Sequence, residues 1–241
     1  FIDKVYVKKE KQKEDPYKNI AISQSEFKIF WESCEELSEQ FPWKAELHQF
    51  MILTALRKRE ALKVKKSYID WKARKINIPK GIEKNRKHDQ EIILTPELEV
   101  LIGNILDIGN RPGLDFYKMK DFPWLFATRK WGAYRYFNKE FRHSSKARLG
   151  GDENYVPELR RLMQEKTGDP ELLYSSKVLR KTYITLSKQR NDGRSDKVKH
   201  LSRHSSEQIL EAHYDKPNLE TIRGYAEKTS EVFNFIQRRS A

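Results

Sequence analysis

The spacing of apolar side chains predicts a helix near the beginning of the chain. After Ser23, large apolar residues recur every three or four positions, at Phe27, Phe30, Trp31, Cys34 and Leu37. This is the period of an amphipathic helix that packs one face against a core. Ser23 and Glu26 have the spacing of a capping box, which closes the first turn of a helix. We therefore expect a helix from Ser23 to about Leu37, with Cys34 inside the core.

Similar patterns predict further helices. One should follow Pro42 and run to about residue 62 through Leu47, Phe50, Met51 and Leu53. Thr95-Pro96-Glu97 is a strong helix start, because it combines an N-cap residue, proline in the first turn and an early acidic side chain. Other helices are expected at residues 133–146, 177–190, 195–201, 206–213 and 219–238.

Three short segments have the composition of strands instead. They lie at residues 67–71, 75–78 and 91–94. Residues 124–127 are predicted to form a buried turn or a short strand, and residues 150–154 a loop. The expected fold is mainly α with a small three-stranded antiparallel β-sheet. We expect one folded domain at residues 21–218, preceded by a charged linker at residues 1–20.

Composition points to a polyanionic partner. The chain has 241 residues, of which 48 are Lys or Arg and 35 are Asp or Glu, for a formal net charge of +13. Nucleic acid is the first candidate and an anionic membrane surface the second. Apolar runs stay well below the ~18 residues that a membrane-spanning helix needs. The single cysteine excludes an internal disulfide and a cysteine-based zinc site.

Five short segments carry the candidate chemistry. They are T-A-L-R-K-R-E at residues 54–60, a polar turn around Lys84, K-V-L-R at 177–180, L-S-R-H at 201–204 and H-Y at 213–214. Arg57 and Glu60 have the spacing of neighbours on one helix face, and so do Lys177 and Arg180. Each segment alone also fits a plain interpretation: a surface ion pair, an exposed turn, a solvated basic face, a structural histidine or an ordinary tyrosine.

Taken in order, these segments resemble the catalytic domain of the tyrosine recombinase (phage integrase) family. T-A-L-R-K-R-E is similar to the first arginine box, with Ala55 where the family usually has glycine. K-V-L-R-K-T-Y is similar to the second arginine box, with Lys177 in a position usually held by histidine. L-S-R-H-S-S and E-A-H-Y are similar to the segments that carry the family's histidine and nucleophile. The type IB topoisomerases of poxviruses are similar at the Lys177 position.

The resemblance implies that residues 21–218 are a catalytic domain and that the linker at 1–20 follows a missing N-terminal DNA-binding region. It also implies a role for each candidate residue. Tyr214 would be the nucleophile, with Tyr225 as the alternative, and Lys84 the general acid, with Lys87 and Lys80 as alternatives. Glu60 would orient one arginine. The groups that contact the phosphate would be Arg57, Lys177, Arg180 and His204. No metal or cofactor is expected, because His200 and His204 lack a third zinc ligand in the sequence.

The implied activity is metal-independent, site-specific DNA recombination through a 3′-phosphotyrosyl intermediate, by the integrase of a mobile genetic element. Expected partners are double-stranded DNA attachment sites, three further copies in a homo-tetramer and accessory DNA-bending proteins. A cytoplasmic, nucleoid-associated location without membrane contact would follow. The helical tail at residues 219–241 either packs on its own domain or is exchanged between protomers. Two alternatives stay open: DNA relaxation of the topoisomerase IB type, and a non-catalytic DNA-binding relic.

Overall fold

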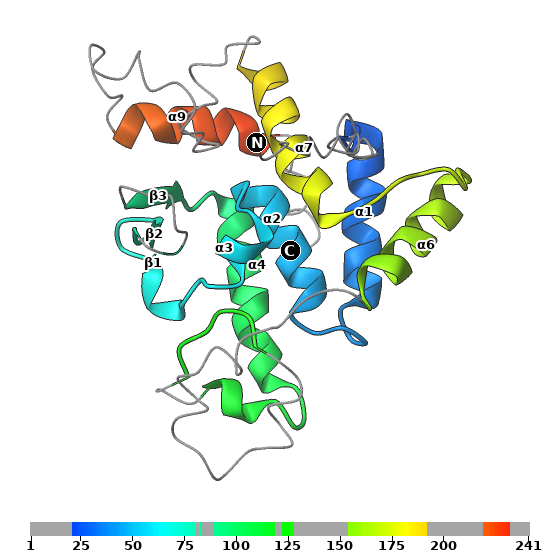
Figure 1. Cartoon of the computed structure of the whole chain (residues 1–241). Helices are drawn as coiled ribbons and strands as arrows, with labels where there is room; N and C mark the ends of the chain where they lie inside the picture. Colours follow the sequence, from blue (N-terminus) through cyan, green and yellow to red (C-terminus); the bar gives the residue numbers. More distant parts are fainter. Residues whose placement is uncertain are drawn as a thin grey trace, which may run out of the picture.

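A computed structural model describes residues 21–80, 82, 89–118, 122–127, 154–191 and 219–231. In this part of the chain, helices surround a central helix, and a small sheet lies to one side (Figure 1). The class expected from the sequence, mainly helical with a small antiparallel sheet, is confirmed. The order is α1 (Gln24–Leu37), α2 (Lys44–Thr54), α3 (Lys58–Ala61), β1 (Ile69–Asp70), β2 (Lys75–Ile78), β3 (Gln90–Ile93), α4 (Pro96–Asp107), α6 (Val156–Thr167), α7 (Ser176–Arg190) and α9 (Leu219–Ser230).

Helix α1 begins with the capping box that the sequence predicts. The Ser23 hydroxyl accepts a hydrogen bond from the Glu26 backbone N–H at 3.2 Å, and the Ser23 N–H donates to the Glu26 carboxylate at 2.7 Å. The predicted apolar face is buried, including Phe30 and Cys34. It packs against α6 and α2.

Helix α2 is the centre of the core. Every residue from Ala45 to Thr54 is buried, and the helix contacts α1, α4 and α7. The prediction that this helix continues to residue 62 is wrong. The chain leaves the helix at Ala55, whose φ of 51° and ψ of 21° are left-handed, and resumes as the short α3. Leu56 and Ala61 are also fully buried, so the apolar pattern continues across the break and does not reveal it.

The sheet has the order β1-β2-β3, with both pairs antiparallel. The second strand has the predicted bounds, and the third is shifted by one residue. The first strand is shorter than predicted, because residues Lys66–Tyr68 form a 3-10 turn (η1). Ile76 and Ile78 point into the core. Thr95 occupies the N-cap position of α4 and Pro96 lies in the first turn, as expected, although the Thr95 side chain makes no capping hydrogen bond.

Helix α6 was not predicted. Its buried residues Leu159, Leu162 and Met163 form a narrow apolar stripe on an otherwise polar and charged segment. Both ends also carry helix signals, since Pro157 lies in the first turn and Gly168 ends the helix with a φ of 70°. Proline near the start and glycine after the end is the usual asymmetry of a helix. Residues 124–127 are buried, and Trp124 forms a single bridge with Lys65, as the sequence suggested.

Several predictions lie outside the described residues. These are the linker at 1–20, most of the loop at 150–154 and the helices at 133–146, 195–201 and 206–213. Helix α9 begins at the predicted residue, and the description ends at Glu231. Within the described ranges, no helix is long and apolar enough to cross a bilayer.

Candidate functional site

Arg57 stands at the tight turn that joins α2 to α3. It is the residue before α3, and its side chain is 52% exposed. Its backbone N–H donates to Oε2 of Glu60 at 2.8 Å, and its Nη1 lies 3.5 Å from Oε1 of the same carboxylate. The Glu60 side chain is fully buried. A single buried carboxylate therefore contacts both the backbone and the guanidinium of Arg57, which limits the directions that the arginine can take.

Arg180 reaches the same turn from α7. Its Nη1 donates a hydrogen bond to the backbone carbonyl of Ala55, two residues before Arg57. Helices α2 and α7 pack closely along this contact. The guanidinium has five N–H donors, and the bond to the Ala55 carbonyl uses one of them. The fold thus brings together two arginine segments that lie more than a hundred residues apart in the sequence.

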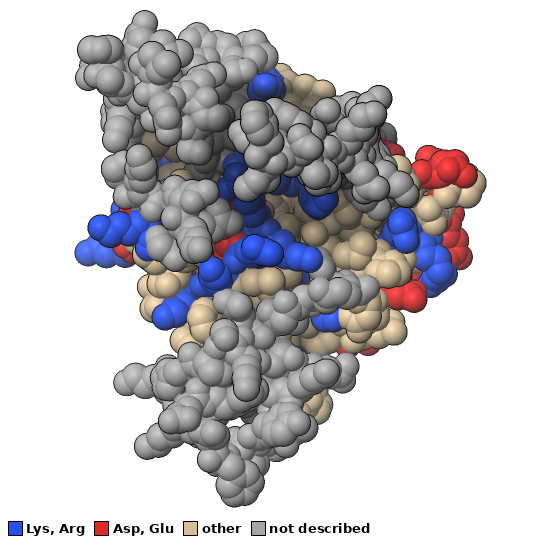
Figure 2. Space-filling model, viewed as in Figure 1, with Lys and Arg blue, Asp and Glu red and all other residues tan. Residues whose placement is uncertain are grey.

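Lys177 lies one turn before Arg180 on α7 and is exposed. The spacing that the sequence suggested for this pair, on one helix, is present. Figure 2 shows Lys and Arg side chains gathered in the middle of the face that carries α3 and the start of α7, whereas acidic side chains are most visible at the edge near α6. Exposed or half-buried basic residues of these two segments are Arg57, Lys58, Arg59, Lys177, Arg180 and Lys181.

The Ala55 turn is covered by a small apolar cluster. Ala55, Ile93, Tyr183 and Ala226 are buried together, and Ile222 and Tyr225 pack against them. The cluster joins the end of α2 to β3, α7 and α9. It therefore packs together the elements that present Arg57 and Arg180, and Tyr225, the alternative nucleophile, packs against the same cluster.

The base of the β2–β3 loop is attached near α3. The Lys63 ammonium donates to the Ile82 carbonyl, and the Lys80 backbone N–H donates to the Asp89 carboxylate at 2.7 Å. Lys63 follows α3 by two residues, so Ile82, at the base of the loop, lies near the end of α3. Lys84 and Lys87 belong to this loop but lie outside the described residues.

Helix α9 packs against its own chain. Arg223 donates to the Ala73 carbonyl in the β1–β2 turn. The Ser230 hydroxyl donates to the buried Glu97 carboxylate at 2.8 Å, and the Asn191 amide lies 3.4 Å from the Thr229 hydroxyl. This arrangement corresponds to the alternative in which the tail packs on its own domain. Exchange between protomers stays a prediction.

The structure therefore places four of the seven predicted site residues. Arg57, Glu60 and Arg180 meet at one turn, and Lys177 lies on the same helix as Arg180. His204 and Tyr214, like Lys84, fall outside the described residues. The sequence did not indicate the Ala55 carbonyl as a partner of Arg180, because a backbone acceptor leaves no side-chain signature. Among the described residues, no group of three His, Cys, Asp or Glu side chains could hold a metal ion.

Comparison with known proteins gives a match in structure. The fold is similar to the crystal structure of XerA recombinase, with a TM-score of 0.54 and 19% sequence identity. The similarity covers 89% of this chain and 66% of that chain, so this chain spans slightly less than two thirds of XerA recombinase. No family model and no curated protein matches the sequence. The chain therefore has a fold of the kind seen in a tyrosine recombinase.

Proposed function

We propose that this protein is a site-specific DNA recombinase, which cleaves and rejoins DNA through a 3′-phosphotyrosyl intermediate without a metal. The observation that carries the proposal is the meeting of Arg57 and Arg180 at the Ala55 turn, in a fold similar to that of XerA recombinase. Two segments that resemble the family's arginine boxes in sequence are thus adjacent in space.

The chemistry follows from the groups assigned. The Tyr214 phenol would release its proton to water as its oxygen attacks the phosphorus, and the bond from phosphorus to the 5′-oxygen would break. Lys84 would give its proton to that oxygen, and the phosphate would become a 3′-phosphotyrosyl ester. Because this ester keeps the energy of the broken bond, a second 5′-hydroxyl can reverse the step on another strand.

The arginines would stabilise the transition state. Negative charge grows on the non-bridging oxygens during attack, and preorganised donors at that position lower the barrier. The two guanidinium groups are held before substrate binds, Arg57 by Glu60 and Arg180 by Ala55. Lys177 and His204 would supply further hydrogen bonds to the same oxygens. Glu60 would act as a positioning residue, since it is buried and contacts Arg57.

Binding to DNA would depend on the basic face of α3 and α7. Phosphate contacts of this kind release counterions, so affinity should fall steeply as salt rises. The remaining partners in this proposal are double-stranded attachment sites, a homo-tetramer and accessory DNA-bending proteins.

DNA relaxation of the topoisomerase IB type is the second candidate. It uses the same chemistry on one duplex, and the lysine at position 177 favours it. The two functions differ in what happens after cleavage. A topoisomerase lets one strand rotate and reseals it, whereas a recombinase joins strands from two sites.

A plasmid assay separates the two candidates. A target duplex is first selected from random DNA by retention on the whole chain, and two copies are placed on a supercoiled plasmid. In EDTA, we expect deletion or inversion products with two copies and none with one, and none from Tyr214→Phe. If plasmids that lack the target are relaxed and no recombinant products form, the proposal is contradicted and the topoisomerase hypothesis is supported.

A further inference from the structure

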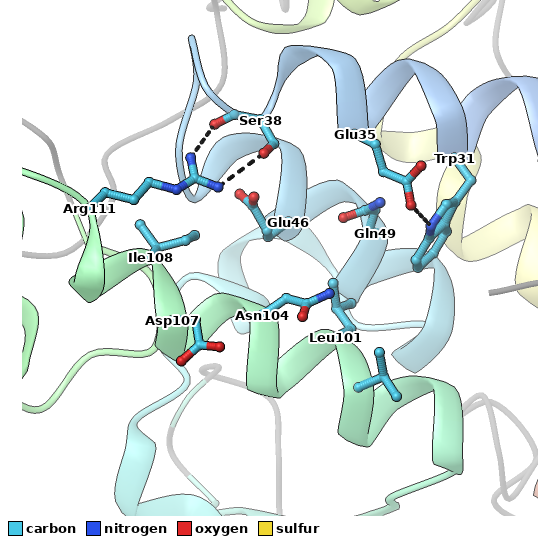
Figure 3. A pocket seen from close by; sticks show the side chains of 11 residues that line it. Trp31, Glu35, Ser38, Glu46, Gln49, Leu101, Asn104, Asp107, Ile108 and Arg111 are labelled. Carbon is cyan, nitrogen blue, oxygen red and sulfur yellow. Dashed lines mark hydrogen bonds between the residues drawn. The ribbon is translucent and has the colours of Figure 1, made fainter. Parts of the chain in front are cut away.

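An acidic cavity opens at the other end of α2 from the arginine turn. Its volume is about 280 Å³, and it lies between α1, α2 and α4 (Figure 3). Its polar lining consists chiefly of Glu35, Glu46, Gln49, Asn104, Asp107 and Arg111. Three carboxylates against one guanidinium make this region acidic on a chain whose formal net charge is +13. Such a cavity repels the phosphates of DNA and attracts a cationic group instead.

Glu46 is the central group of the cavity. The residue is 5% exposed, and its Oε2 has no hydrogen-bond partner among the described residues. Figure 3 shows its carboxylate between Arg111 and Gln49, in the space that the three helices enclose. Arg111 does not supply a donor to this oxygen. Both of its Nη atoms bond to Ser38, at 3.0 Å to the carbonyl and 3.2 Å to the hydroxyl. A buried carboxylate oxygen without a partner is costly, and a bound donor would remove that cost.

The other acceptors surround this carboxylate from different elements. Glu35 comes from α1, where it accepts from the Trp31 indole N–H at 3.0 Å. Gln49 lies one turn after Glu46 on α2, and Asn104 and Asp107 lie on α4. Carboxylate and amide oxygens on several sides suit a flat group with several N–H donors. A guanidinium has five donors in one plane, whereas an alkylammonium has three at one point.

We infer that this cavity binds a single guanidinium group, with Glu46 as its main partner and Asp107, Glu35 and the two amides as further acceptors. The group could belong to a free alkylguanidine or to an arginine side chain of a protein segment, and the chemistry is the same. The site is separate from the proposed DNA cleavage site, because Glu46 lies near the start of α2 and the turn with Arg57 follows its end. An 11-residue helix is roughly 16 Å long.

Binding should become tighter as pH rises. Burial raises the pKa of Glu46 to about 7. Hydrogen bonds from the Glu46 and Trp43 backbone and from the Ser38 side chain, together with the positive charge of Arg111, oppose this only in part. The charged groups that face Glu46 from its neighbours are Glu35, Asp107 and Arg111. Burial also raises the pKa of Cys34, Tyr117 and Tyr155, so these groups stay neutral in this range. Because a guanidinium prefers the ionised carboxylate, the affinity should rise roughly tenfold from pH 6 to pH 8.

The test is a titration of the whole chain with butylguanidinium, N-acetylarginine methylamide and butylammonium at low salt. The Trp31 indole N–H signal, identified through Trp31→Phe, reports binding at the cavity wall by NMR. At pH 8 we expect saturation by at least one guanidine, with a Kd of about 1 mM or lower, and binding at least tenfold weaker for butylammonium. Tighter binding of the arginine derivative would identify a protein side chain as the natural source, and tighter binding of butylguanidinium a free ligand.

Variants separate the site from general surface charge. Glu46→Gln keeps the shape and removes the charge, so it should weaken binding at least tenfold at pH 8 and abolish the pH dependence. Asp107→Asn should weaken binding to a smaller extent. Glu158→Gln, on the exposed surface of α6, is the matched control and should bind as the parent does. No saturation by either guanidine, equal binding of butylammonium, or unchanged binding by Glu46→Gln would overturn the inference.

Discussion

Replacing Arg180 by lysine is expected to slow covalent cleavage of a target duplex by about 10²- to 10³-fold, the usual effect of losing one preorganised donor at a developing oxyanion. Lysine keeps the positive charge but has no planar fork. It therefore cannot bond to the Ala55 carbonyl and present a second donor in a fixed direction. Duplex affinity should change little, because it depends on many basic groups and the charge is retained.

The measurement is a single-turnover cleavage rate on a nicked duplex, with affinity from a parallel binding titration. Arg190→Lys is the matched control, since Arg190 is exposed at the far end of the same helix. It should cleave at the parental rate. If Arg180→Lys and Arg190→Lys cleave equally fast, Arg180 does not contact the reacting phosphate, and the site is misassigned.

Replacing Lys84 by alanine should lower the cleavage rate by about 10²- to 10⁴-fold on ordinary DNA, the range for loss of a general acid. The same variant should recover most of the parental rate when sulfur replaces the leaving 5′-oxygen, because a thiolate leaves without a proton. The contact of Lys63 with Ile82 holds the base of the Lys84 loop near the end of α3, and the contact of Lys80 with Asp89 joins the two sides of that base.

Lys80→Ala and Lys87→Ala serve as controls, since both residues belong to the same loop or its base. Neither should show selective rescue by the sulfur substrate. Selective rescue of Lys87→Ala instead would move the general acid to that position. Equal loss on both substrates for all three variants would remove this loop from the chemistry.

The features that the sequence predicted best are local. The capping box of Ser23 and Glu26, the Thr95-Pro96 start of α4 and the strand Lys75–Ile78 each depend on neighbouring residues, and each is present. The break at Ala55 depends on a long-range contact instead. Its left-handed backbone is stabilised by the packing of β3, α7 and α9, which the apolar pattern of one segment does not contain.

In the candidate site, too, the sequence predicted the local features and missed the long-range contacts. Spacing alone placed Arg57 with Glu60 and Lys177 with Arg180, because each pair is three residues apart. Spacing could not show that Arg180 bonds to the turn before Arg57, since that contact joins positions 125 residues apart. The Glu46 cavity was also missed, because its lining comes from three helices and has no motif.

The central claim is the phosphotyrosyl bond, and one measurement tests it most directly. The chain is incubated in excess EDTA with a nicked duplex of its selected target, and the covalent adduct is digested and mapped by mass spectrometry. We expect DNA linked to Tyr214, with no adduct for Tyr214→Phe and the parental amount for Tyr225→Phe. An adduct at another residue, or no adduct on a duplex that the chain binds specifically, would contradict it.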